Sequence, residues 1–247
     1  MSRSLETLRA EYGDEFPRAV NLLGVRYALT RERAFSRVYW AADRKSSFVM
    51  SRFHDGSASI SLPEVEARWA GWSNDERLDL CASLGSLEGQ DDVPGILRFL
   101  WQHGDPICQG TLALQVAYRL PQDEAFALLC DALGKGRPGD AANISQGVAH
   151  TKHPKAQEVL LAHLDTLWGA GDLWDDDPFT NFRAFDATCC IQHLLELGAE
   201  PALFEDKVRR LAAHPCKGNR DTCAGYLRPH YPWLPAYEAP TFGGERG

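Results

Sequence analysis

Apolar residues recur at intervals of three and four along most of the chain after residue 60, the spacing that places them on one face of a helix. Most segments with this spacing end at Gly or Pro, where helices commonly stop. We expect amphipathic helices at residues 61–72, 91–104, 122–136, 155–171 and 201–215.

A second series of apolar-periodic segments alternates with the first, and each of its members opens near an aspartate. Aspartate favours a helix start because its side chain accepts a backbone N–H and its charge suits the positive end of the helix dipole. The five aspartates are Asp75, Asp105, Asp140, Asp186 and Asp221, at separations of 30, 35, 46 and 35 residues. One such helix pair cannot bury its apolar face alone, so five pairs in a row must stack. The pattern predicts an all-α solenoid.

The segment "HGDPICQGTLALQVAYRL" at 103–120 resembles a repeat of the HEAT family, in which a turn with an Asp-Pro-type opening leads into a second helix. The resemblance covers about residues 61–232 and implies a HEAT-like α-solenoid of about five helix pairs, with the second helices along a concave surface. The basic residue that the family often carries after the aspartate is absent, since Gln109 is nearest, and the subfamily stays open. Residues 1–60 do not match the repeat and are expected to form an N-terminal capping segment. Residues 233–247 are rich in Pro and Gly and are expected to form a C-terminal tail.

The composition of the chain indicates the cellular compartment in which we expect the protein. Of its 247 residues, 44% are hydrophobic and 24% are charged, as in ordinary soluble domains. No apolar stretch approaches the roughly 18 residues of a membrane helix, and residues 1–16 carry charges where a secretory signal would be apolar. The seven cysteines lie mostly within helical patterns, which favours reduced thiols. We expect a cytoplasmic protein without a membrane partner.

Charge is concentrated in the middle of the chain. The net charge is −8, but residues 61–199 hold 9 Lys and Arg against 21 Asp and Glu, a net of −12. A field of this sign repels a phosphate backbone and attracts basic protein surfaces. Nucleic acid is therefore disfavoured as a partner, and a basic protein is favoured.

The stretch "DLWDDDPFT" at 172–180 places Trp174 before Asp175, Asp176 and Asp177. It falls in the one separation of 46 residues, which indicates an insertion of roughly ten residues in a connection between helices. Such loops often carry function, and an aromatic residue beside charges is typical of a contact surface. We expect these four residues to bind a partner; the alternative is a solvated loop with its tryptophan packed on the core.

The same aspartates faintly resemble the magnesium-binding motif of class I terpene synthases. That family also needs a second motif with a hydroxyl residue, and "NDERLDLC" at 74–81 has Leu78 in that position. Adjacent loop carboxylates alone rarely supply the converging oxygens that a hard cation requires. No pair of cysteines has the C-x-x-C spacing of a zinc site. We expect neither a metal nor a cofactor.

A polar strip is predicted along the second helices of the three central repeats. Positions at equal distances from the opening aspartates share one helix face and are mostly polar; the alternative is the polar face that any surface helix has. The candidate binding residues are Thr111, Gln115, Asn143, Gln146, His150, Gln192 and Glu196, with Cys108 and Cys189 at the first position of two repeats.

Motifs of catalysis are absent from the sequence: it contains no G-x-S-x-G, Walker loop, G-x-G-x-x-G or H-E-x-x-H. We therefore expect a non-enzymatic binding protein, such as an acidic inhibitor or immunity-type protein that masks a basic partner. The alternative is an enzyme on the same scaffold, a lyase, a transferase or a DNA glycosylase-like protein, with His150 and Glu196 in its groove. A structural adaptor is a third alternative. Vicinal Cys189 and Cys190 leave a redox role open.

Overall fold

The computed structural model describes residues 61–72, 77–78, 80–81, 84, 92–135, 140–174 and 182–236. Within these residues every regular element is helical, which confirms the all-α prediction for this part of the chain. The proposed capping segment 1–60 and Asp175, Asp176 and Asp177 lie outside the described residues. The elements are α5 (Leu62–Trp69), α7 (Val93–His103), α8 (Pro106–Arg119), α9 (Gln122–Leu133), α10 (Asp140–His150), α11 (Ala156–Trp168), η3 (Gly171–Trp174), α12 (Arg183–Glu196), η4 (Pro201–Phe204), α13 (Glu205–Ala212) and α14 (Lys217–Leu227).

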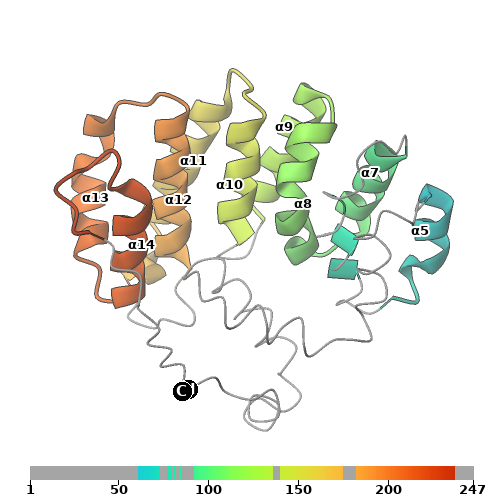
Figure 1. Ribbon diagram of the computed structural model, residues 1–247, viewed down its shortest axis with the longest axis horizontal. Helices are drawn as coiled ribbons and strands as arrows, with labels where there is room; N and C mark the ends of the chain where they lie inside the picture. Colours follow the sequence, from blue (N-terminus) through green and yellow to red (C-terminus); the bar gives the residue numbers. More distant parts are fainter. Residues whose placement is uncertain are drawn as a thin grey trace, which may run out of the picture.

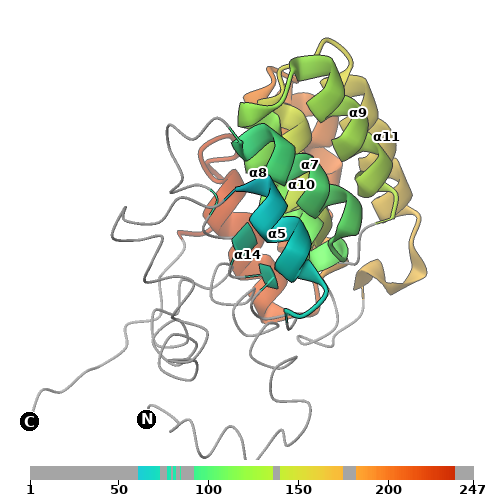
Figure 2. The ribbon, with the colours of Figure 1, turned by 90° about the vertical axis from the view of Figure 1, so that its right-hand side faces the viewer.

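The helices from α7 onward form two layers. The even-numbered helices α8, α10, α12 and α14 pack one against the next, and each packs against the odd-numbered helix that precedes it (Figure 1). Figure 2 shows α9 and α11 together on one side of α8 and α10. At the N-terminal end of the array, α5 packs against α7. Each even-numbered helix between the two ends therefore has neighbours on both sides and a face turned away from the odd-numbered layer.

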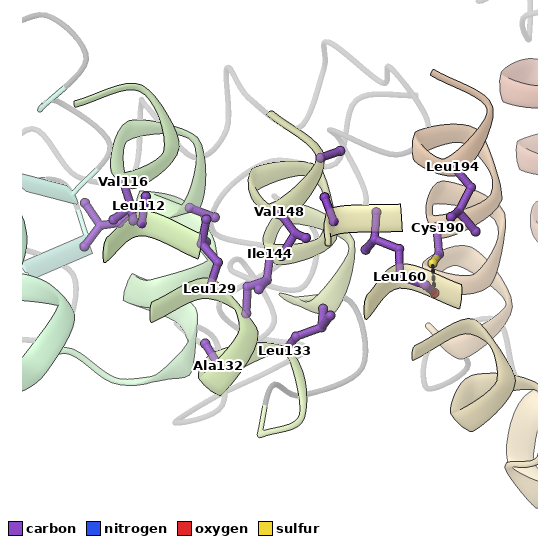
Figure 3. Packing of buried hydrophobic residues seen from close by; sticks show 14 of the residues in the cluster. Leu112, Val116, Leu129, Ala132, Leu133, Ile144, Val148, Leu160, Cys190 and Leu194 are labelled. Carbon is purple, nitrogen blue, oxygen red and sulfur yellow. Dashed lines mark hydrogen bonds between the residues drawn. The ribbon is translucent and has the colours of Figure 1, made fainter. Parts of the chain in front are cut away.

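The core lies between the two layers (Figure 3). Leu112 and Val116 of α8, Leu129 of α9, and Ile144 and Val148 of α10 are completely buried. Their spacing of four residues within α8 and α10 places each pair on one helix face, as the apolar pattern predicts. Full burial of such a side chain stabilises the fold by about 1.5–3 kcal/mol. Trp69 and Trp101 are buried as well.

Close approach of α8 and α10 depends on Gly147. A Cβ atom at this position would lie 2.9 Å from the carbonyl oxygen of Ala113 and 2.9 Å from Cδ2 of Leu129. Both distances are shorter than van der Waals contact, and one of the atoms belongs to backbone that cannot move freely. Glycine is therefore required where the two helices meet.

The aspartates that were expected to open helices have different positions in the structure. Asp105 is the N-cap of α8, and its carboxylate accepts the N–H of Cys108 at 2.9 Å. Asp186 lies in the first turn of α12, which begins at Arg183, so it is near the helix start as expected. The prediction is wrong for Asp221, because α14 begins at Lys217 and Asp221 lies beyond its first turn. Asp186 is 1% exposed and accepts the N–H of Ala142, in the first turn of α10, at 3.1 Å. It therefore also stabilises the start of a neighbouring helix.

None of the described helices combines the length and the apolar character that crossing a bilayer requires.

Candidate functional site

The predicted polar strip lies on adjacent helices. Thr111 and Gln115 belong to α8, Asn143, Gln146 and His150 to α10, and Gln192 and Glu196 to α12, and α10 packs directly against both α8 and α12. These seven side chains, which we call the polar strip, are partly or fully exposed, whereas the core residues of the same helices are fully buried. The stacking of the helices thus brings together polar residues that are far apart in the chain.

Two positions that the sequence placed in register with the strip are not on the surface. Cys108 is 4% exposed and Cys189 is 5% exposed. Cys189 packs with Ala142 and Phe185 in a small apolar cluster, against which Tyr226 also lies. Cysteine behaves as a small apolar residue when it is buried in this way, so both positions belong to the packing and not to a contact surface.

Vicinal Cys189 and Cys190 are both buried, although only one of them was expected to face the core. Burial raises the pKa of both thiols above the ordinary value, and the Cys190 Sγ donates a hydrogen bond to the carbonyl of Leu160 at 3.3 Å. Because the thiolate is the reactive form, these two residues are poor nucleophiles in the folded protein.

His150 contacts Tyr118 on the neighbouring helix α8. Its Nδ1 is hydrogen-bonded at 2.9 Å to the hydroxyl of Tyr118, and the two ring centroids are 5.3 Å apart. Glu196 lies on α12, which packs against α10 on its other side. We call these three residues, which lie on three successive even-numbered helices, the Tyr-His-Glu cluster.

Glu196 is held by two groups of its own helix. The side-chain amide of Gln192 donates to one carboxylate oxygen at 2.9 Å, and Nδ1 of His193 lies 3.2 Å from the other. The hydrogen bond from His193 is the largest cause of a lowered pKa at Glu196, so the carboxylate is ionised near neutral pH. The Glu196 side chain is still 46% exposed, whereas that of His193 is 6% exposed. These two contacts thus fix the orientation of the carboxylate, which remains accessible to solvent.

Tyr118 was not among the residues predicted from the sequence, yet it is the most exposed aromatic side chain of the described residues, at 62%. It follows Gln115 by three positions and Thr111 by seven, which is the spacing of one helix face. A search for aromatic as well as polar residues at these intervals would have found it. Tyrosine offers both a hydrogen-bonding hydroxyl and a broad apolar ring, and is a common contact residue.

Trp174 lies in η3 and is partly buried. Its ring packs edge-on against Trp168 at 5.4 Å between centroids and lies 5.6 Å from the ring of His214, while the guanidinium of Arg210 lies 4.6 Å from its centroid. The buried His214 also bonds the carbonyl oxygen of Leu173 at 2.9 Å. These contacts fix the chain immediately before Asp175.

The connection that contains this tryptophan runs from 169 to 182, and its two ends are tied together. Nε of Arg183, in the first turn of α12, forms an ion pair with Asp172 at 2.5 Å. Phe182, at the other end of the connection, is buried. The described residues on either side of 175–181, Trp174 and Phe182, are thus both held by packing.

Acidic residues of the described helices are concentrated on the odd-numbered layer. The helices α9 and α11 contain five acidic residues and no Lys or Arg. These residues are Asp123, Glu124, Asp131, Glu158 and Asp165. Arg98 pairs with Glu124 through both nitrogen–oxygen contacts, at 2.6 and 2.8 Å, and Lys135 pairs with Asp131 at 2.5 Å. The polar strip contributes only Glu196 to the negative charge, so most acidic groups lie away from it.

No group of three or more His, Cys, Asp or Glu residues in the described part of the chain is arranged to hold a metal ion. His193 and Glu196 are in contact at 3.2 Å, and they are not part of such a group. What this region offers is an ionised carboxylate, an imidazole and an exposed phenol ring at an open surface.

The chain matches no protein-family model, and comparisons with curated proteins and with solved structures found no match.

Proposed function

We propose that this protein is a non-catalytic, HEAT-like α-solenoid that binds a basic protein partner through the polar strip. The observation that carries the proposal is the assembly of the strip, in which α8, α10 and α12 bring seven partly exposed polar side chains into adjacent positions. We also propose that residues 1–60 form an N-terminal cap over the first pair of helices. Repeat arrays need such caps because their terminal apolar faces would otherwise be exposed.

Direct contacts come from the strip and from Tyr118. Amide side chains such as Asn143, Gln146 and Gln192 can both donate and accept hydrogen bonds, so they select a partner with complementary groups. Tyr118 supplies a large side chain that loses little conformational entropy when it is covered. An aromatic residue among polar ones is the usual composition of an energetically dominant contact.

The acidic charge acts at longer range. Since α9 and α11 carry five acidic residues on the other layer, a partner on the strip does not touch them. Their field still attracts a basic protein and raises the rate of encounter, which falls as salt screens the charges. Asp175, Asp176 and Asp177 add to the same field. A basic enzyme, such as a nuclease whose phosphate site becomes masked, is the partner class that this charge favours, and an inhibitor or immunity-type role follows.

Two sets of variants test the proposal: one removes side chains that contact the partner, and the other removes charges that attract it from a distance. The full chain is used to capture proteins from lysate of the native host, and the retained protein is identified, purified and measured by surface plasmon resonance. A strip variant, Tyr118→Ala with Gln146→Ala and Gln192→Ala, is expected to raise the dissociation rate at least tenfold. A charge variant, Asp131→Asn with Glu158→Gln, is expected to lower the association rate and its dependence on salt while leaving the dissociation rate within about twofold.

The proposal is wrong if the strip variant binds the captured protein like the wild type, or if the captured protein is acidic and its association ignores salt. Circular dichroism of each variant serves as the folding control.

A second candidate function is an enzyme that uses the Tyr-His-Glu cluster. The 2.9 Å contact between the Tyr118 hydroxyl and His150 favours it, because an imidazole within hydrogen-bond reach of a hydroxyl can act on it as a general base. Against it stands the exposure of the Tyr118 residue at 62% and of the Glu196 side chain at 46%, since catalysis of this kind gains from the exclusion of water. Turnover of a compound in a host metabolite extract by the wild type, lost in His150→Gln, would support the enzyme.

A further inference from the structure

We propose that α13 carries a docking surface for an acidic peptide segment of a protein partner, with a carboxylate of that segment bound to the guanidinium of Arg210. The surface consists of Lys207 and Arg210 of α13 and of Trp168 and Trp174, and we call these four residues the Trp-Arg cluster. Figure 1 shows α13 beside α14 at the C-terminal end of the array. The cluster contains no residue of the polar strip, so this inference goes beyond the proposed function.

Four contacts join the members of the Trp-Arg cluster. The rings of Trp168 and Trp174 meet edge to face, with centroids 5.4 Å apart. The guanidinium carbon of Arg210 lies 4.6 Å from the centroid of Trp174 and 5.1 Å from that of Trp168. Nζ of Lys207 lies 4.8 Å from the centroid of Trp168. Aromatic rings attract cations at such distances, so the two positive groups are held next to the two tryptophans.

Arg210 retains its capacity to bind a carboxylate. Arg98, Arg183 and Arg209 each pair with a carboxylate of this chain. In the part of the chain that the structure describes, the contacts of the Arg210 guanidinium are instead those with the two indole rings, and the residue is exposed. The N–H groups of a guanidinium point outward in its plane, so contact with an aromatic ring leaves them able to bind a carboxylate through two hydrogen bonds.

The tryptophans that support Arg210 are themselves held in place. Both are partly buried and pack against the hydrophobic core. The ring of Trp174 also lies against that of His214, with centroids 5.6 Å apart, and His214 is completely buried. A partner therefore meets a guanidinium whose support is fixed before binding, and a group that is already positioned loses less conformational entropy when it is covered.

The charges near Arg210 favour an anion. Lys207, one helical turn away, adds a second positive charge. Asp165 lies 3.7 Å from Lys207, but its side chain is 76% exposed, and solvent weakens such a pair. Residues 200–236 hold six Lys and Arg against four Asp and Glu, a net charge of +2, whereas residues 61–199 have a net charge of −12. This end of the chain is thus complementary in charge to an acidic partner.

An acidic peptide fits the Trp-Arg cluster better than a nucleic acid does. Single-stranded nucleic acids stack their bases on open aromatic faces. Here each of the two indole rings contacts the other and at least one cation, and both are partly buried. The acidic middle of the chain also repels a long phosphate backbone. A peptide with a few carboxylates requires no free ring face and carries less charge.

A labelled nona-glutamate peptide tests this surface. The full chain is titrated into the fluorescein-labelled peptide at low salt, and fluorescence anisotropy gives the dissociation constant. Arg210→Gln is expected to weaken binding about tenfold. Arg210→Lys, which keeps the charge but lacks the paired N–H groups, is expected to weaken it about threefold.

Arg209→Gln is the matched control, because it removes one positive charge from the same helix. The guanidinium of Arg209 also lies over a tryptophan, Trp233, at 4.5 Å, but it already pairs with Glu205. This variant is expected to change the dissociation constant by less than about twofold. Equal losses in Arg209→Gln and Arg210→Gln, or no binding by the wild type, would overturn the proposal. Circular dichroism checks that each variant is folded.

Two further titrations test other occupants of the surface. Nona-thymidylate with the same label is expected to bind more weakly than nona-glutamate, and tighter binding would overturn the proposal in favour of a nucleic acid. Asp175, Asp176 and Asp177 follow Trp174 directly in the sequence, so a variant with Asn at all three positions is titrated as well. Binding of nona-glutamate by this variant but not by the wild type would mean that the chain's own carboxylates occupy Arg210, and would also overturn the proposal.

Discussion

The hydroxyl of Tyr118 and Nδ1 of His150 lie 2.9 Å apart on neighbouring helices α8 and α10. Thirty-two positions separate the two residues in the sequence, and the contact exists only because the even-numbered helices stack side by side. It links Tyr118, an exposed residue that was not predicted from the sequence, to His150 of the polar strip.

A double-mutant cycle should detect coupling between Tyr118 and His150. Tyr118→Phe, His150→Ala and the double variant are compared by urea denaturation. Because the pair is partly exposed, its hydrogen bond contributes about 0.5–1 kcal/mol of coupling to the free energy of unfolding. Additive effects, with coupling near zero, would mean that solvent competes fully for both groups.

Gly147→Ala should destabilise the protein by about 1–3 kcal/mol, because the added Cβ would lie 2.9 Å from both Ala113 and Leu129 and force α8 and α10 apart. Gly134→Ala is the matched control. No atom lies within 4 Å of a Cβ at that position, and its φ of −79° suits alanine, so this change should be neutral or slightly stabilising. Thermal unfolding of both variants measures the difference, and equal stabilities would contradict the close packing.

Asp186 and Asp221 should respond very differently to replacement by alanine. Asp186 is 1% exposed and accepts the N–H of Ala142, so Asp186→Ala leaves a buried donor without its partner and is expected to cost about 1–3 kcal/mol. Asp221 pairs with Lys217 one turn away on the surface, and such pairs contribute about 0.3–0.5 kcal/mol. Chemical denaturation compares the two variants. Similar losses of unfolding free energy in the two variants would show that the buried hydrogen bond of Asp186 contributes no more than the surface ion pair of Asp221.

His163 should make the protein less stable in acid. Burial lowers its pKa from 6.5 to about 4, and its Nε2 is buried without a hydrogen-bond partner. The neutral form is therefore favoured in the folded state, while the unfolded chain binds a proton below pH 6.5. Stability from this residue is present above pH 6.5 and is lost as the pH falls toward 4, by up to about 1.4 kcal/mol per pH unit.

His163→Leu isolates that contribution. The variant should lose less free energy of unfolding than the wild type between pH 7 and pH 5, as measured by urea denaturation at each pH. His230→Gln replaces an exposed histidine and is expected to leave the wild-type pH dependence in place. If His163→Leu and the wild type have parallel pH profiles, His163 is not a buried neutral histidine.

Local pattern was sufficient to predict most helices from the sequence. Residues 122–136 and 155–171 were predicted as helices, and α9 and α11 occupy 122–133 and 156–168, because apolar spacing and Gly stops act over a few residues. The strip residues on α8, α10 and α12 followed from the same spacing, and all of them are at least partly exposed. Their role in binding remains a proposal.

Predictions were less accurate where they depended on contacts between a residue and other helices. Asp186 lies in the first turn of α12, as expected, but its buried carboxylate also accepts the N–H of Ala142 in α10, and no property of its own segment indicates this second role. Cys189 was placed in register with the strip, yet packing with Phe185 and Ala142 covers it. The sequence indicated an acidic middle but not its position in the fold, and the structure places five of these acids on α9 and α11, in the layer away from the polar strip.

The sequence by itself determined the helical class, the alternation of two helix series and the polar face of α8, α10 and α12, since backbone geometry converts a spacing of three and four into one face regardless of context. Only the tertiary structure decided which faces meet. The approach of α8 and α10 at Gly147, the contact between Tyr118 and His150, and the distribution of acids over two layers all arise from the stacking of helices. Such contacts depend on how side chains from distant segments fill the space between the helices. No local stretch of sequence specifies this packing.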